Sequence, residues 1–375
     1  RENGQKAYEM MSCYEGLLEL YKIDGDPSYL SAIEKTVANI ISDEINVAGS
    51  GSSFECWYGG KARQALPTYH TMETCVTFTW MQLCGRLLRF SRDSSYGDLI
   101  ETAIYNALMA SLKDDASQIA KYSPLEGWRA EGEEQCGMHI NCCNANGPRA
   151  FAMIPKVMYE VDGKSVYVNL YAQSEADIIL SPEERLHLRQ TTDYPVSDSI
   201  QIEIDSPKPV RCEVALRIPG WSEDVSVAVN GVEMRDIAPG HYLRMEREWK
   251  SGDKIHVRLD LRGRVASEGN SVAIVRGPVV LARDSRFKDG FVDEGVALVS
   301  DDGYVELSPL EGCDFAWMAF TVPMRVGTLL ENNRSPRQVH LCDFASAGDT
   351  WDRSQRYKVW LPQTLNVMNY DYVPY

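Results

Sequence analysis

The chain has 375 residues, 44% of them hydrophobic, and a formal net charge of −16. This length is enough for two or three hydrophobic cores, and the acidic balance argues against nucleic acid, whose phosphates select basic surfaces. No run approaches the ~18 uninterrupted apolar residues of a membrane span, and no signal peptide opens the chain. Because Arg1 leads directly into helical sequence, we expect the native N-terminus to lie elsewhere, which leaves periplasmic, secreted and cytoplasmic locations open.

Apolar residues at helical spacing dominate the first part of the chain. The pattern predicts an amphipathic helix that ends at Asp24-Gly25-Asp26-Pro27, then a second helix over about residues 30–41. Later helices are predicted at about 73–91, 95–112 and 147–159, the last opened by Gly147-Pro148 because proline suits a first helical turn. Helix pairs joined by short turns are typical of an α/α barrel or toroid.

After residue 160 the pattern changes to the alternation of β-strands, as at residues 166–171, 200–204 and 225–229. Short strands at regular spacing favour an antiparallel β-sandwich. We therefore predict an α+β multi-domain protein. Its parts are a helical domain over residues 1–159, a β-sandwich over 160–265, and a β-rich segment over 266–375 that completes or extends the sandwich.

Two short motifs carry residues with metal-binding chemistry. Cys142-Cys143 is an adjacent pair of thiols, and Glu73-Thr74-Cys75 adds a carboxylate and a third thiol. Three thiols and a carboxylate suit a tetrahedral Zn²⁺ site, and a coordinated thiol is a nucleophilic thiolate at neutral pH. The alternative is that these cysteines are small buried hydrophobes, since the pair matches no C-x-x-C signature. Of the ten cysteines, six lie between residues 56 and 143, which favours metal chemistry over disulfides.

Backbone geometry constrains both motifs. Residues two apart on a helix point in different directions, so Glu73 and Cys75 are expected to bind from an extended or capping conformation just before a helix. Cys142 and Cys143 are likewise predicted to lie in a loop before the helix that Pro148 opens.

The two motifs resemble the E-T-C and C-C-x-x-N motifs of the β-L-arabinofuranosidases, glycoside hydrolase family 127 with its relative family 146. The segments Leu66-Pro67, Tyr105-Asn106-Ala107-Leu108 and Tyr122-Ser123-Pro124-Leu125 also resemble that family in the same order, as do later segments at 275–280 and 357–362. The family fold implies part of an (α/α)6 toroid followed by antiparallel β-sandwich domains. This chain supplies about five helices against roughly twelve in a closed toroid, so we expect the upstream half of the barrel to come from outside this chain, and these residues alone to be weakly active or inactive.

The resemblance also implies a site. The zinc ligands that the resemblance implies are Glu73, Cys75, Cys142 and Cys143. It implies Cys142 as the nucleophile and Glu55 as the acid/base of a retaining glycoside hydrolase. The implied reaction removes a terminal β-L-arabinofuranosyl-type sugar from plant glycans. The chain departs from the family around Glu55 and at Asn144-Ala145, where relatives commonly carry two prolines. Candidate substrate-binding residues beside the motifs, each also compatible with a structural role, are His70, Tyr122, His139 and Trp57.

Two other functions fit the same residues. The wider family includes a hydrolase of aceric acid, an acidic sugar of pectin, and such a substrate would need a cation such as Lys61, Arg63 or Arg149 in the pocket. The protein could also be a non-catalytic glycan-binding protein in which zinc only ties loops together. A carboxylate close to an open pocket that contains Cys142 would favour the enzyme.

Overall fold

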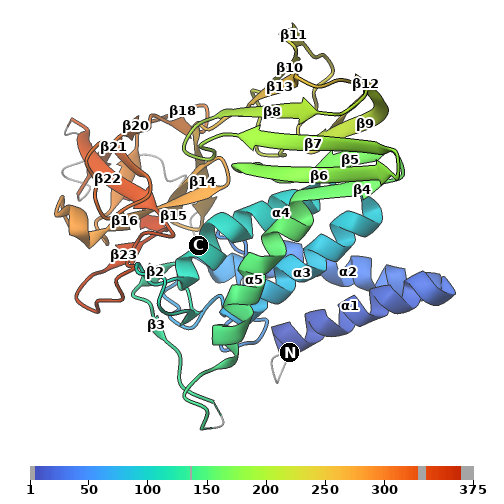
Figure 1. Ribbon diagram of the computed structural model, residues 1–375. Helices are drawn as coiled ribbons and strands as arrows, with labels where there is room; N and C mark the ends of the chain where they lie inside the picture. The colour runs from blue at the N-terminus through green and yellow to red at the C-terminus, as the bar shows by residue number, and fades with distance from the viewer. Residues whose placement is uncertain (1–4, 136, 328–334, 365–375) are drawn as a thin grey trace, which may run out of the picture. The chain divides into compact units, whose positions relative to one another are not determined.

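The computed structural model describes residues 5–135, 137–327 and 335–364. It divides into two compact units, and each mixes helices with sheets (Figure 1). The first unit combines residues 1–78, 103–147 and 262–375, and the second combines residues 79–102 and 148–261. The predicted α+β class is confirmed. Within the described ranges, no helix is both long and apolar enough to cross a membrane.

The first unit opens with two helices, α1 (Ala7–Asp24) and α2 (Pro27–Asp43). Helix α1 ends because Gly25 adopts a left-handed conformation with φ of 73° and donates its N–H to the Tyr21 carbonyl. The Asp26 side chain then caps α2 by accepting the Ser28 N–H at 2.9 Å. The predicted break between the two helices is confirmed.

The segment predicted as one helix over residues 95–112 changes character along its length. Helix α4 (Ser95–Ala103) gives way to a π-helical turn at Ile104–Leu108 and a 3-10 turn at Met109–Ser111. Within the π-helical turn, the buried Asn106 donates its side-chain N–H to the Pro278 carbonyl and accepts the Val280 N–H, both at 2.8 Å. This carboxamide therefore ties the helical segment to the C-terminal sheet of the same unit.

Two further helices begin in the first unit and continue into the second: α3 (Thr74–Ser91) and α5 (Cys142–Met158). The start of α3 agrees with the prediction. The start of α5 does not, because the helix begins five residues before Gly147 and contains Pro148 in its interior. The expectation that the cysteine pair lies in a loop before this helix was therefore wrong.

The C-terminal part of the first unit is a sheet with the order β17-β21-β22-β16-β15-β14-β19-β18. Its strands are β14 (Gly263–Glu268), β15 (Ser271–Arg276), β16 (Val279–Asp284), β17 (Val296–Leu298), β18 (Ser300–Asp301), β19 (Tyr304–Val305), β21 (Ala319–Val326) and β22 (Arg337–Asp343). Short strands pair at its margins: β20 (Ser308–Pro309), β23 (Tyr357–Lys358) and β24 (Leu361–Pro362).

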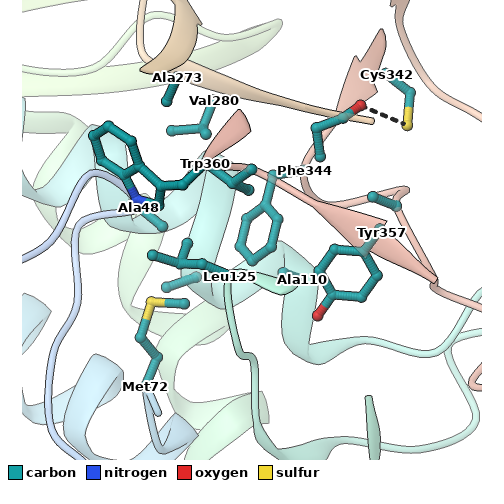
Figure 2. Close-up of a cluster of buried hydrophobic side chains, with 14 residues drawn as sticks. Ala48, Met72, Ala110, Leu125, Ala273, Val280, Cys342, Phe344, Tyr357 and Trp360 are labelled. Carbon is teal, nitrogen blue, oxygen red and sulfur yellow. Dashed lines mark hydrogen bonds between the residues drawn. The ribbon is translucent and has the colours of Figure 1, made fainter. Parts of the chain in front are cut away.

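A core cluster joins this sheet to the motif-bearing part of the first unit (Figure 2). Phe344, Tyr357 and Trp360 pack there with Met72 and Leu125, and all five are buried. The Tyr357 hydroxyl also donates to the Pro124 carbonyl at 2.7 Å. The strand β2 (Glu126–Gly127) pairs with β23, so the chain around residues 122–128 is held against the C-terminal strands.

The second unit contains two β-sheets of a sandwich-like kind. One has the order β11-β10-β13-β8-β7-β6 and the other β12-β9-β5-β4, with a single parallel pair, β5 and β9. The strands are β4 (Tyr159–Asp162), β5 (Ser165–Val168), β6 (Ser174–Ser181), β7 (Glu184–Thr191), β8 (Ser199–Asp205), β9 (Val210–Arg217), β10 (Ser226–Val229), β11 (Val232–Glu233), β12 (Tyr242–Trp249) and β13 (Asp253–Arg258). The predicted alternation is borne out in β8, where Ile200, Ile202 and Ile204 are fully buried.

A buried arginine organises the polar core of the second unit. The Arg217 side chain is 0% exposed and forms ion pairs with Asp98 and with Glu101, the latter at 2.8 Å. Glu101 also accepts the Tyr194 hydroxyl at 2.9 Å. Because burial opposes charge, this cluster depends on the complete set of partners.

Candidate metal centre and adjoining cavity

A capping arrangement at the start of α5 positions the cysteine pair. The Asn141 side chain accepts the Cys143 N–H at 3.0 Å, and the Asn144 side chain accepts the Asn141 N–H at 2.8 Å. This reciprocal pair is a capping box, with asparagine at both ends. Gln135 satisfies a further free donor by accepting the Cys142 N–H at 2.9 Å. Cys142 and Cys143 are consequently the first two residues of the helix.

The Glu73 motif uses the start of α3 in a similar way. The Glu73 carbonyl accepts the Thr77 N–H at 3.0 Å, so Glu73 is the cap of the helix and Cys75 lies in its first turn. The Thr74 hydroxyl donates to the Ala120 carbonyl at 2.7 Å, which fixes the helix start against β1 (Ala120–Tyr122). Two helix N-termini thus present their thiols to one point. Both carry positive partial charge, which favours thiolates and carboxylates there.

The side chains of Glu73, Cys75, Cys142 and Cys143 converge so closely that one ligand atom from each lies within 4.8 Å of all the others. The Cys75 and Cys143 sulfurs are 3.3 Å apart, and Glu73 Oε1 lies 3.5 Å from Cys142 Sγ and 3.8 Å from Cys143 Sγ. A tetrahedral ion with bonds of ~2.3 Å to sulfur has edges of ~3.7 Å. The spacing and the donor set therefore fit Zn²⁺.

Proton sharing within this group distinguishes Cys142 from the other two cysteines. The pKa of the Cys142 thiol is lowered because it accepts hydrogen bonds from Cys143 and Cys75, and the pKa values of those two donors are raised for the same reason. Burial, with the nearby charges of Cys142 and Glu55, raises the pKa of Glu73 to about 8. Cys142 is also the least buried of the three thiols, so its sulfur is the most accessible nucleophile in the group.

Glu55 lies in a loop of unusual backbone conformation and is held by two lysines. Its φ is 70°, and Lys6 pairs with one carboxylate oxygen while Lys121 lies 3.0 Å from the other. Burial raises the pKa of Glu55, but the hydrogen bonds and charges of the two lysines outweigh burial and leave this pKa below its usual value. Glu55 is therefore a carboxylate at neutral pH in the free protein.

A cavity of about 670 Å³ adjoins Glu55. Three carboxylates and two cations line it: Glu55, Glu131, Glu133, Lys121 and Arg353. Aromatic rings form much of the remaining wall: Phe54, Tyr69, His70, Tyr122 and Trp128. A lining of rings with a few polar groups is typical of a small-molecule or sugar site.

Lys121 connects this cavity with the candidate metal centre. Its ammonium group lines the cavity beside Glu55, while its main-chain carbonyl lies 3.9 Å from Cys143 Sγ. Its charge also contributes to the lowered pKa of Cys142, after the hydrogen bonds from Cys143 and Cys75. Cys142 itself is not among the residues that line the cavity.

The structure separates the four predicted substrate-binding residues. His70 and Tyr122 line the cavity with Glu55. Trp57 is only 7% exposed and does not line it. The His139 side chain is 91% exposed and pairs with Glu134 at 2.8 Å.

The cations that the sequence suggested for an acidic substrate do not line the cavity either. Lys61 donates to the Ile41 carbonyl at 3.2 Å and Arg63 to the Tyr58 carbonyl at 2.8 Å, and Arg149 is exposed on α5. The cavity cations are Lys121 and Arg353.

Sequence reasoning missed several residues of this region. Lys121 immediately precedes the Tyr122-Ser123-Pro124-Leu125 motif, so its position beside a motif was the only available signal. Asn146 was visible as the last residue of the C-C-x-x-N motif, and its side chain donates to Cys75 Sγ at 3.2 Å. Trp128 carried no signal of its own.

Comparison with known proteins identifies the class: the chain is similar in sequence and in fold to a group of glycoside hydrolases. A family model for the catalytic domain of β-L-arabinofuranosidase GH127 matches residues 2–156, and a model for the GH127 middle domain matches residues 165–261. The chain belongs to glycoside hydrolase family 127.

Individual relatives are distant in sequence. The non-reducing end β-L-arabinofuranosidase of Bifidobacterium longum subsp. longum is 23% identical over 293 residues, which are 71% of this chain and 43% of that protein. Among solved structures, a GH127 β-arabinofuranosidase is similar with a TM-score of 0.79 and 23% identity, covering 96% of this chain and 60% of the other. The GH127 β-L-arabinofuranosidase of Geobacillus stearothermophilus T6 also gives a TM-score of 0.79, at 20% identity, with 96% and 61% covered. These structural matches establish the fold. The chain spans 43% of the length of the curated relative and about 60% of each of the two solved structures.

Proposed function

We propose that the protein is a retaining glycoside hydrolase that removes a terminal β-L-arabinofuranosyl-type sugar. The observation that carries this proposal is the Glu73, Cys75, Cys142 and Cys143 group beside a cavity lined by Glu55. Membership of family 127 supports the same chemistry, and relatives of this chain bear the name β-L-arabinofuranosidase.

The proposed metal is zinc, held by the four converging side chains. Zinc bound there would keep the thiols deprotonated and supply a Lewis acid. The donor set supports zinc over a hard cation such as Mg²⁺ or Ca²⁺, which prefers ligands made only of oxygen.

In the first step, the Cys142 thiolate attacks the anomeric carbon and a carbon–sulfur bond forms. The bond from that carbon to the leaving oxygen breaks, and Glu55 gives a proton to this oxygen. Because Glu55 is a carboxylate in the free protein, it must first take up this proton from solvent. In the second step, Glu55 takes a proton from water, the water oxygen attacks the anomeric carbon, and the carbon–sulfur bond breaks to restore the thiolate. Two displacements at one carbon retain its configuration.

The cavity charges bear on the choice of substrate. Its three carboxylates outnumber its two cations, and one of those cations already pairs with Glu55. A negatively charged sugar would meet net repulsion, so a neutral arabinofuranoside is favoured over an acidic sugar of pectin. Glu55 lines the cavity but Cys142 does not, so the predicted pocket with both groups is met only in part. The choice of an enzyme over a purely structural zinc site therefore rests on the partial exposure of Cys142 and on membership of family 127.

The test combines metal analysis with activity in the full-length protein that carries residues 1–375. We expect about one zinc per chain, and we expect Cys142→Ala to lower zinc content and abolish release of L-arabinose from an aryl β-L-arabinofuranoside. Cys13→Ala is the matched control, because Cys13 is an exposed thiol on α1 outside the metal group. Full activity of a zinc-free preparation, or of Cys142→Ala, would refute the mechanism. A parallel assay on an aceric acid glycoside separates the two sugar classes.

A further inference from the structure

Two pairs of stacked aromatic rings lie in the wall of the cavity. Phe54 and His70 stack with ring centroids 4.3 Å apart and 19° between planes. Tyr69 and Trp128 stack at 5.2 Å and 25°. All four line the same cavity as Glu55, and they are called the aromatic platform below.

Three of the four platform residues, Phe54, Tyr69 and His70, are exposed, and Trp128 is partly buried. Phe54 is 63% exposed and Tyr69 is 41% exposed. Burying an apolar ring is favourable, so a ligand that covers a water-exposed ring in a cavity gains binding free energy. Exposed rings beside a proposed acid/base point to a ligand with apolar faces.

The backbone beneath Phe54 adopts a rare, left-handed conformation at several neighbouring residues. Ser52, Phe54 and Glu55 all have positive φ, at 78°, 45° and 70°. A bulky residue in the left-handed region is rare, and each such residue costs free energy that surrounding structure must supply. The Phe54 N–H donates to the His70 carbonyl at 3.0 Å, and this bond holds the exposed ring on its partner.

The second pair depends on a glycine. A side chain at Gly127 would place its first carbon 2.8 Å from Cε1 of Tyr69, and Gly127 has a φ of 96°. The absence of a side chain therefore creates the space in which the Tyr69 ring lies beside Trp128. Because Gly127 ends β2, which pairs with β23, the platform rests on ordered backbone.

We propose that the aromatic platform binds sugar rings of the leaving group, the part of the glycan beyond the bond that is cut. This inference rests on the proposed function, since it places the platform on the far side of that bond from Cys142. A sugar ring offers C–H faces to aromatic rings and hydroxyls to polar groups, and Glu131, Glu133 and Arg353 line the same cavity. Cavities of roughly 300–1,000 Å³ hold ligands larger than one pentose, so 670 Å³ leaves room for leaving-group rings.

The test compares two substrates with the same terminal L-arabinofuranosyl group. One substrate has a leaving group of two or more sugar rings. The other is the methyl glycoside, whose leaving group is methanol and contains no sugar ring. For Phe54→Ala and Trp128→Ala we expect KM for the oligosaccharide to rise roughly 3- to 10-fold each, with the methyl glycoside unchanged. Phe291→Ala is the control, since Phe291 is 80% exposed and does not line the cavity.

Binding is measured separately from turnover. The probe is the oligosaccharide product without its arabinofuranosyl group, titrated by tryptophan fluorescence and calorimetry against wild type and both variants. Weaker binding by the variants supports the platform even if the wild-type protein cleaves neither substrate. Absence of cleavage by the wild type would refute only the proposed function. Equal loss on both substrates, unchanged KM and binding, or preferential binding of a proline-rich peptide would overturn the platform. Circular dichroism and zinc content identify a variant that has failed to fold.

Discussion

The hydrogen bond from Asn146 to the metal group gives a quantitative prediction. Asn146 is 5% exposed on α5, and its Nδ2 donates to Cys75 Sγ at 3.2 Å. Hydrogen bonds to charged acceptors contribute about 1.5–3 kcal/mol, and removing an outer partner of a metal ligand typically weakens metal binding by about 10- to 100-fold. We expect Asn146→Ala to weaken zinc binding by that factor, equivalent to about 1.4–2.7 kcal/mol.

The measurement is competition for zinc with a chromophoric chelator. Alanine is the best helix former, so the substitution should leave α5 intact. Asn39→Ala is the control, because Asn39 is exposed on α2 and its side chain donates within that helix, to Asp43 at 2.6 Å. At zinc concentrations well above both dissociation constants, the stabilisation that zinc confers should fall by the same free energy. Wild-type zinc affinity in Asn146→Ala would show that this bond does not support the metal group.

Two further substitutions test the charges around the site and in the second unit. Lys121→Met removes one of the two cations that hold the pKa of Glu55 down, so this pKa rises and the protonated carboxyl persists to higher pH. The alkaline limb of the kcat/KM profile should therefore move to higher pH. Lys208→Met, at an exposed lysine, is the control and should leave the alkaline limb where it is in the wild type. Arg217→Met leaves the buried Glu101 and the partly buried Asp98 without their cation and should lower the free energy of unfolding by about 3–5 kcal/mol in urea denaturation. The half-exposed Arg258→Met should cost less than about 1 kcal/mol by the same measurement, and equal effects of the two arginine variants would contradict the reasoning.

The sequence predicted the residues of the metal group more accurately than it predicted the backbone conformation that positions them. Thiols and a carboxylate have specific ligand chemistry, so four residues in two motifs could be named without knowing their geometry. The helix start was wrong because Gly147-Pro148 is a strong local signal. The capping box of Asn141 and Asn144 starts the helix earlier, because it satisfies free N–H groups there, and the helix continues through Pro148 although that residue lacks an N–H.

The surroundings of Glu55 were beyond sequence reasoning for a different reason. Its ion-pair partners are Lys6, 49 residues away, and Lys121, on a three-residue strand that no periodicity could reveal. The cavity draws its walls from positions as far apart as Phe54 and Arg353. Contacts of this range depend on the complete fold, and neither composition nor local pattern encodes them.

The metal group and the acid/base candidate have largely separate supports. The ligands are fixed by the capped N-termini of α3 and α5, whereas Glu55 is fixed by a strained loop and two lysines. The strand β1 is the connection, because Lys121 reaches Glu55 with its side chain but lies beside Cys143 only through its main-chain carbonyl. A substitution at Lys121 keeps that carbonyl, so it should change proton transfer and leave the ligand atoms in place. Asn146→Ala should do the reverse, because its side chain contacts a ligand sulfur and does not line the cavity. The separation is incomplete in one direction, because Lys121→Met also removes a charge that lowers the pKa of Cys142.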